Sequence, residues 1–532
     1  MARDFHPVAE QIVDDLFSAS PALAEWAGDH RYDHQLPDLS TAAVRAEVAR
    51  LRESVDVLHE VDPEVLDAED GVDLQLLSAA VDARLFELTE IREYEWNPLR
   101  HNPGSLFHSL LTRDFAPAEE RLASVLARLE ALPDALATAE SVLVDCPTIH
   151  VETAINQLAG TTALIRDDVA ELAARVPVRA GEVAATQAKA LEALEQHAGW
   201  LRRALAKPGR DPRLGRRLWE ARLWHSLDSD LTASALLERA EANLIEAGER
   251  IRDTASELTG APDVRATLDR LAADHPDDAT IVSDAEAALA AVTDFVRSHE
   301  LVSLVDDPCL VVEMPEFARG VAVAYCDAPG PLETADVPTF YAIAPTPSDW
   351  SAAKVESFYR EYNRHMVHNL TVHEAMPGHF LQLAHARKFR GSTRVRAACE
   401  SGTFIEGWAV YAEELMADAG YGGLGVRMQQ LKMQLRMTIN AILDQLVHCA
   451  DLSEEDGMAL MRDRGFQEEG EAAGKWRRAL LTSTQLSTYF VGYTEMAAIG
   501  RARPDGTTQR EWHDAMLAHG CPPPRHLRTL LA

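Results

Sequence analysis

The feature that most limits the fold is a helical spacing of apolar residues from the N-terminus to about residue 305. Apolar side chains recur three and four positions apart, as in AEERLASVLARLEALPDALATAESVLV and LLERAEANLIEAGERIRDTASEL. This spacing places them on one helix face, and the Ala, Leu, Glu and Arg of these segments favour helices. Proline and glycine clusters at Pro133, Pro147, Pro208 and residues 260–262 separate one helix from the next. The first 305 residues therefore predict a stack of long helices.

The pattern changes between residues 308 and 347. Three short runs, CLVVEM, GVAVAYC and TFYAIAP, are rich in β-branched or aromatic residues and are separated by proline and glycine, which is typical of strands. Helical spacing returns at ESFYREYNRHMVHNLTVHEA. We therefore expect a mainly α (α+β) fold with a small antiparallel sheet. We expect a helical half at 1–305 and a second half at 306–532. The second half holds the sheet (306–347), two or more helices (350–420) and the C-terminal helices, and the two halves form one intertwined domain.

The charge of the chain excludes several kinds of partner. There are 85 Asp and Glu against 51 Lys and Arg, a net charge of −34 over 532 residues. Because such a surface repels phosphate backbones, we expect no nucleic-acid partner. No stretch reaches the roughly 18 apolar residues of a membrane span, and acids stand at the start where a signal peptide needs basic residues. We expect a cytoplasmic protein with no membrane partner, whose six dispersed cysteines are free thiols.

The segment with the clearest chemistry is His373-Glu374-Ala375-Met376-Pro377-Gly378-His379. Metallopeptidases use a His-Glu pair and a second His to place two imidazoles on zinc and a carboxylate beside the attacking water. Here the histidines are six residues apart, which in a regular helix rotates them by about 120° and separates them by about 9 Å. Pro377 and Gly378 can break the helix and return His379 to the metal. The alternative is a helix kink with two unrelated histidines.

A third ligand is expected from a helix further along the chain. In EGWAVYAEEL, Glu406 and Glu413 share a helix face, with small Ala409 between them, which suits a ligand and a carboxylate that supports the ligands. We also expect Gln382 to support them by hydrogen bonding. For Glu414 a solvated acidic face is the preferred interpretation. The nearby histidines His365, His368 and His385 are possible competing ligands, but their spacing favours surface or satisfied histidines.

HEAMPGHFLQ and EGWAVYAEEL resemble the paired signatures of the uncharacterised bacterial family DUF885, a zincin-like group similar to metallopeptidases. The segments AGDHRYDHQLPDLS, VAYCDAPG, STYFVGYTEMAAIG and WHDAMLAHGCPPPRHL also agree, so the resemblance spans nearly the whole chain. It implies a role similar to that of gluzincin peptidases, without a defined substrate.

The resemblance also implies how a substrate is held. In such enzymes a sheet beside the active-site helix pairs its edge strand with an extended peptide, and the helical half forms the walls of a cleft that favours short peptides. TFYAIAP is the candidate edge, with Tyr341, Ala342 and Ile343 as substrate-binding residues. A tyrosine from a late helix stabilises the oxyanion in similar peptidases. Tyr489 and Tyr493 are equal candidates here, and a packed aromatic pair is the alternative.

The sequence therefore predicts a large helical zincin-like hydrolase that binds one Zn²⁺ through His373, His379 and Glu406, with Glu374 as general base. The expected substrate is a short peptide. One alternative is a hydrolase of a non-peptide amide or other small metabolite. Another is a non-catalytic helical binding protein with a vestigial metal site, but such a site needs no general base.

Overall fold

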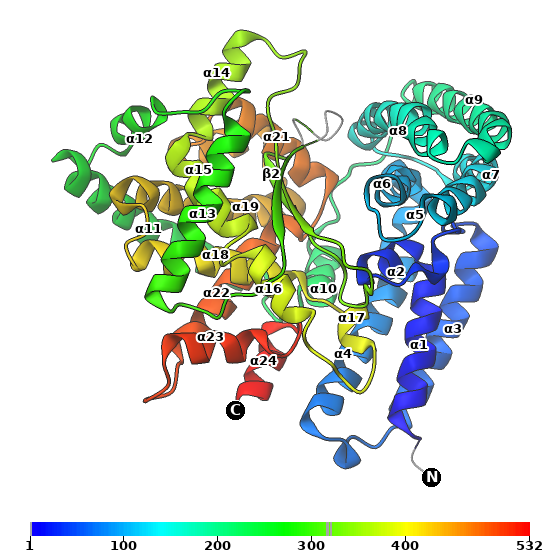
Figure 1. Ribbon diagram of the computed structural model, residues 1–532, viewed down its shortest axis with the longest axis horizontal. Helices are drawn as coiled ribbons and strands as arrows, with labels where there is room; N and C mark the ends of the chain where they lie inside the picture. Colours follow the sequence, from blue (N-terminus) through cyan, green and yellow to red (C-terminus); the bar gives the residue numbers. More distant parts are fainter. Residues whose placement is uncertain (1–2, 315–318, 320–321) are drawn as a thin grey trace. The chain divides into compact units, whose positions relative to one another are not determined.

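The computed structural model describes residues 3–314, 319 and 322–532, and it is mainly helical with one small sheet (Figure 1). The chain forms two compact units. The N-terminal unit contains Met1–Pro212, Pro329–Val337 and Gly391–Cys399, and the C-terminal unit contains Arg213–Ala328, Pro338–Arg390 and Glu400–Ala532. This division differs from the boundary expected at residue 305, because helices within residues 213–305 share a core with the C-terminal helices.

The N-terminal unit consists of helices, three of which (α7, α8 and α9) lie side by side (Figure 1). Leu122, Leu126 and Leu129 of α7 recur at helical spacing and are buried in the core that these helices share. The helices of the unit are α1 (Phe5–Ala19), α2 (Pro21–Ala27), α3 (Thr41–His59), α4 (Ala68–Phe86), α5 (Glu93–Trp96), α6 (Gly104–Thr112), α7 (Ala118–Val142), α8 (Thr148–Ala174), α9 (Ala180–Ala204) and α17 (Val395–Ala398).

Pro133 lies inside α7, so the helix boundary predicted there is wrong. A proline removes one backbone hydrogen bond and crowds the preceding turn. Leu129, Leu132 and Leu136 are nevertheless buried on both sides of it. Burial of this continuous apolar face keeps the helix intact through the proline. The other predicted boundaries agree with the structure, since Pro147 precedes α8 and Gly260 follows the last residue of α11.

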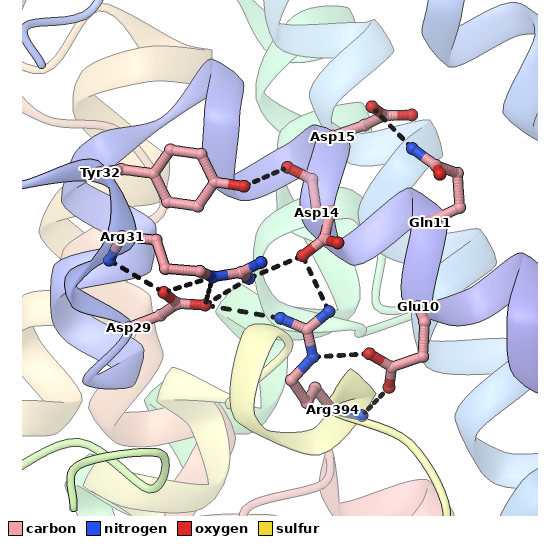
Figure 2. A network of polar contacts seen from close by, with 8 residues as sticks. All are labelled: Glu10, Gln11, Asp14, Asp15, Asp29, Arg31, Tyr32 and Arg394. Carbon is pink, nitrogen blue, oxygen red and sulfur yellow. Dashed lines mark hydrogen bonds and ion pairs between the residues drawn. The ribbon is translucent and has the colours of Figure 1, made fainter.

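An ion-pair network holds the segment Gly391–Cys399 within the N-terminal unit (Figure 2). Arg394 forms salt bridges with Glu10 (2.6 Å) and Asp14 (2.8 Å) of α1 and contacts Asp29 at 3.4 Å. Arg31 pairs with Asp14 and Asp29 as well, at 2.7 and 2.6 Å. Because the two guanidiniums share the same carboxylates, the network joins parts of the chain that are more than 360 residues apart.

The C-terminal unit is built around α19, which is buried on nearly all sides and contacts α11, α15, α18 and α22. Along α11, one face of the helix is buried, and its apolar residues recur at helical spacing: Leu236, Ala240, Leu244 and Ile251. The helices of the unit are α10 (Arg216–Leu227), α11 (Ala233–Thr259), α12 (Val264–Ala272), α13 (Ile281–His299), α14 (Ala352–Glu361), α15 (Arg364–Glu374), α16 (His379–Ala386), α18 (Gly402–Asp418), α19 (Gly423–Ala450), α20 (Glu454–Ala459), α21 (Glu469–Leu481), α22 (Thr488–Arg501), α23 (Gln509–Leu517) and α24 (Pro524–Leu531). Among the described residues, no helix has the length and apolar character needed to cross a membrane.

The sheet has three strands, β1 (Cys309–Glu313), β2 (Ala324–Asp327) and β3 (Thr339–Ile343), in the order β1-β3-β2. It is mixed rather than antiparallel, because β1 runs parallel to β3 and β2 runs antiparallel to it. Residues 320–321 of the predicted second strand lie outside the described residues. The prediction of three strands is confirmed, and the prediction of their directions is wrong.

The TFYAIAP run forms the central strand, so its assignment as the substrate-binding edge is wrong. Tyr341, Ala342 and Ile343 are at most 1% exposed, and the strand pairs with a neighbour on each side. A central strand has a neighbour on each edge, and β3 is accordingly the most buried of the three strands. The edge next to the site helix is instead β2, which contacts α15.

Candidate metal centre

The His-Glu pair lies at the end of α15, and the helix breaks directly after it. Asn363 caps the start of α15 by accepting a hydrogen bond from the Met366 N–H at 3.3 Å. The helix ends at Glu374, the Met376–Pro377 peptide bond is cis, and α16 begins at His379. Two helices thus replace the single continuous one. This break is the local feature that the spacing of the two histidines required.

Gly378 is needed where the chain turns back against α15. Its N–H donates to the Val372 carbonyl at 2.9 Å. A Cβ atom at this position would lie 2.0 Å from the carbonyl oxygen of His373 and 2.3 Å from that of Val372. Only glycine permits this close approach of backbone to backbone. The turn therefore depends on a residue without a side chain.

The break brings three ligand atoms together. One atom each of His373, His379 and Glu406 lie within 4.8 Å of one another. The Glu406 Oε2 atom is 3.5 Å from His373 Nε2 and 3.6 Å from His379 Nε2. The imidazole centroids are 4.7 Å apart, and the rings are nearly perpendicular at 87°. Both rings therefore direct a nitrogen towards the same carboxylate oxygen.

Glu413 orients the first histidine. Its Oε1 atom lies 2.7 Å from His373 Nδ1, and its Oε2 accepts a 2.6 Å hydrogen bond from the Asn369 side-chain amide. Burial lowers the pKa of His373, but the Glu406 and Glu413 carboxylates outweigh it and raise that pKa well above its usual value. Because Glu413 accepts the proton on Nδ1, Nε2 is the nitrogen whose proton a bound cation would replace.

Glu374 is buried beside the ligands, with 8% of its surface exposed. Its carboxylate accepts a hydrogen bond from the backbone N–H of Cys326 on β2. Burial raises the pKa of Glu374, and the negative charge of Glu406 adds to this rise, while His373 and His379 oppose it. A carboxylate with a raised pKa is better suited to accept a proton near neutral pH.

Two contacts fix α18, which carries Glu406. Trp408 Nε1 donates a 2.8 Å hydrogen bond to the Pro377 carbonyl, so the helix is held against the break between the histidines. On its other side, α18 crosses α22 at Gly407 and Gly492, where a Cβ on either glycine would lie within 3 Å of the other helix. This crossing brings the first turn of α22 close to Glu406.

The two candidate tyrosines of α22 have different surroundings. The charge of Glu406 is the main cause that raises the pKa of Tyr489, and burial adds to it, so this hydroxyl keeps its proton. Arg478 of α21 donates to the Tyr489 hydroxyl at 3.5 Å. Tyr493, one turn later, instead donates to Glu414 Oε2 at 2.9 Å. Tyr489 therefore lies in the electrostatic field of Glu406, whereas Tyr493 belongs to the surroundings of Glu414.

Comparison with known proteins identifies the family. The model of the family described as "Bacterial protein of unknown function (DUF885)" matches residues 21–531. This chain belongs to the DUF885 family. None of the curated proteins compared with it matches significantly.

Two solved structures share the fold of this DUF885 protein, and both carry the description "putative lipoprotein". The protein from Shewanella oneidensis, of unknown function, has a TM-score of 0.81 and 27% identity, and the match covers 100% of both chains. The protein from Colwellia psychrerythraea has a TM-score of 0.80 and 15% identity, with 99% of this chain and 98% of that chain covered. At 15% identity the second likeness shows the fold alone.

The remaining predictions for the site have mixed outcomes. Glu413 contacts the candidate ligand His373, whereas Gln382 donates to Cys521 Sγ at 2.9 Å and has no described hydrogen bond to His373, His379 or Glu406. Glu414 is buried rather than solvated, because Arg250, Tyr493 and Arg501 surround it. His385 and His368 are occupied by the Ser303 carbonyl and the Tyr421 hydroxyl, both at 2.7 Å.

Three supporting groups of this DUF885 protein were missed in the sequence. Asn369 lies four residues before His373, so helical spacing could have placed it on the same face. The Cys326 N–H and the Arg478 side chain come from distant elements, and no local pattern marks them. Tyr341, predicted to bind substrate, shares a 3.2 Å hydrogen bond with Thr371 and thereby joins β3 to α15.

The residues fit a zinc ion. Two imidazole nitrogens and one carboxylate oxygen form a common catalytic donor set. Ligand atoms at about 2.0–2.1 Å from a tetrahedral zinc are roughly 3.3–3.4 Å apart, close to the 3.5 and 3.6 Å found here. Glu406 Oε2 is buried and has no hydrogen-bond partner among the described residues. Since buried polar atoms are rarely left without a partner, this oxygen fits a position next to a cation.

Proposed function

We propose that this DUF885 protein is a zinc-dependent hydrolase that cleaves short peptides, with a gluzincin-like site. The observation that carries the proposal is the convergence of His373, His379 and Glu406 next to a buried glutamate that ligates nothing. A purely structural metal site needs ligands but has no use for Glu374. A hydrolytic site needs both.

Zinc, when bound, would supply Lewis-acid activation of water and of the substrate carbonyl. Glu374 accepts the proton of the attacking water and passes it to the leaving amine. The hydrogen bond from Cys326 holds the Glu374 carboxylate, and Glu413 holds the imidazole of His373, so neither group has to reorient during the reaction.

Tyr489 is the group that we assign to the oxyanion. Its hydroxyl remains protonated beside Glu406 and can donate a hydrogen bond to the negative oxygen of the tetrahedral intermediate. Arg478 holds this hydroxyl and adds positive charge near it. Tyr489 comes from α22 and Arg478 from α21, so neither lies on a helix that carries a metal ligand.

The sheet favours a peptide over other amides. Strand β2 is an edge strand, and its residue Cys326 directs its N–H to Glu374. An extended peptide can pair with such an edge through backbone hydrogen bonds, which places a peptide bond along the strand next to the general base.

The test is digestion of a peptide library by the zinc-loaded protein, with Glu374→Gln as the control variant. The wild-type protein should cleave short peptides, and Glu374→Gln should bind the same zinc while turnover falls about 10²- to 10⁴-fold. Full zinc occupancy with no turnover on peptide and amide libraries would refute the hydrolase. An unchanged rate in Glu374→Gln would refute the mechanism.

A further inference from the structure

Two cations on α21 lie next to the tyrosine of the metal centre. Lys475 is buried, with 7% of its surface exposed, and Arg478 follows three residues later on the same side of the helix. The Arg478 guanidinium reaches the Tyr489 hydroxyl at 3.5 Å. Tyr489 in turn lies in the field of Glu406. Arg478 therefore contacts the site directly, and Lys475 lies one turn before it on the same side of α21.

Neither cation has an acidic partner among the described residues. Glu471, one turn before Lys475, forms its ion pair with Arg436 and accepts a 3.4 Å hydrogen bond from Tyr362. The contrast is Lys432 of α19, a second buried lysine, which pairs with Glu361 at 2.7 Å. A chain with 85 acids and 51 Lys and Arg does not lack carboxylates to neutralise a lysine.

The buried position of Lys475 lowers the free energy of unfolding of the protein. Burial lowers the pKa of Lys475 well below its usual value, and repulsion by Arg436 lowers it further, while Glu471 only partly opposes this. Burial therefore favours the neutral amine of Lys475, and holding it as an ammonium without a partner destabilises the fold. An anion that enters from outside would remove this cost.

We propose that Lys475 and Arg478 bind a carboxylate of the substrate, namely the free C-terminus of a short peptide. The inference rests on the proposed hydrolase, whose substrate class it narrows. Because Arg478 also contacts Tyr489, the carboxylate lies near the cleaved bond. The enzyme is then a peptidase that releases short C-terminal fragments and cleaves peptides with a blocked C-terminus poorly.

The test measures peptide binding to the zinc-loaded Glu374→Gln protein by calorimetry. The three probes are acetyl-Ala-Ala-Ala, its C-terminal amide, and acetyl-Ala-Asp-Ala amide, whose only carboxylate is in a side chain. The free C-terminus should bind at least about tenfold more tightly than either amide, and adding Lys475→Met should abolish this preference. Equal affinities, equal binding of the aspartate peptide, or a preference that survives Lys475→Met would overturn the proposal.

Thermal stability separates a binding role from a structural one. Lys475→Met should keep or raise the melting temperature, because it replaces a buried amine without an acidic partner by an apolar side chain, whereas Lys432→Met should lower it by leaving Glu361 unpaired. Equal losses in the two variants would show that Lys475 is structural. Failure of the hydrolase proposal is distinguishable, since the wild-type protein would then cleave neither peptide form while Lys475 still controlled the binding preference.

Discussion

At the scale of single residues, neighbouring positions with the same chemistry have different surroundings. Glu413 and Glu414 are adjacent buried acids of α18, but the first contacts His373 and the second contacts Tyr493 and two arginines. Tyr489 and Tyr493 differ in the same way, because Tyr489 lies in the field of Glu406 and Tyr493 hydrogen-bonds to Glu414. Within each pair, a substitution of the second residue is therefore a control for the same substitution of the first.

The first prediction compares the two glutamates. Glu413→Gln should reduce zinc affinity about 10- to 100-fold, because the carboxylate that orients His373 is lost. Glu414→Gln should leave zinc affinity unchanged and lower thermal stability, since Arg250 would lose its carboxylate partner. Competition with a chromophoric chelator gives the affinities. Equal zinc affinity of both variants would contradict the assigned role of Glu413.

The second prediction compares the two tyrosines. Tyr489→Phe should lower turnover about 10²- to 10³-fold with zinc affinity and melting temperature nearly unchanged. Tyr493→Phe should keep turnover but destabilise the fold by about 1–3 kcal/mol, because buried Glu414 loses a donor. Steady-state kinetics and urea unfolding measure these effects. A larger loss of turnover in Tyr493→Phe would show that the assignment is reversed.

At the scale of elements, the site depends on one break between helices and one close helix crossing. The break at 375–378 turns His379 towards His373, and the crossing of α18 and α22 brings Tyr489 to Glu406. Both depend on glycines that allow backbone atoms to approach. The rest of α15 and α18 is ordinary amphipathic or buried helix.

The third prediction tests the break. Gly378→Ala should abolish tight zinc binding, because its Cβ would overlap the His373 carbonyl and displace His379. Gly160→Ala, in open space within α8, should instead stabilise the protein by about 0.5–1 kcal/mol through helix propensity. Metal analysis after gel filtration measures the first effect and thermal unfolding the second. Full zinc occupancy in Gly378→Ala would exclude a requirement for glycine.

At the scale of the whole molecule, the chain enters the N-terminal unit three times, and polar contacts hold the returning segments. Glu333 of the segment Pro329–Val337 pairs with His30 at 2.8 Å, and Arg394 of Gly391–Cys399 pairs with α1 (Figure 2). The three residues of the candidate metal centre all lie within the C-terminal unit. The two units therefore have separate stabilising contacts, and the stability of each can be tested separately.

The fourth prediction concerns pH and the N-terminal unit. Burial lowers the pKa of His30, but Asp33 and Glu333 outweigh it and raise this pKa to about 9. Because the folded-state pKa exceeds the unfolded value of about 6.5, the stabilisation is complete below pH 6.5 and is lost as the pH rises to about 9. His30→Gln should remove this slope in urea unfolding, and His34→Gln should keep it. A slope of the opposite sign would exclude the charged pair.

The fifth prediction concerns zinc removal. Because a ligand that binds only the folded state stabilises it, a chelator should increase amide hydrogen exchange in α15, α16 and α18. Exchange in α7, α8 and α9 should stay unchanged, because these helices share a separate core. Mass spectrometry of peptic fragments measures both. An equal response in the two sets of helices would show that the metal is not confined to the predicted site.

The sequence alone determined the helical architecture, the presence of three strands and the three residues, His373, His379 and Glu406, that meet at the candidate metal centre. These features depend on local spacing: apolar periodicity, a proline and glycine between two histidines, and a glutamate on a helix face. Residue spacing is visible in one dimension, so it can be interpreted without coordinates.

The tertiary structure alone decided the rest. Strand order made β3 central, and burial of its apolar face kept α7 helical through Pro133. Packing also gave the two tyrosines different surroundings, Tyr489 in the field of Glu406 and Tyr493 hydrogen-bonded to Glu414. Lys475 also gained significance only through the absence of a partner among the described residues. Each of these depends on contacts between residues far apart in the chain, and those contacts are set by the competition for buried surface across the whole unit.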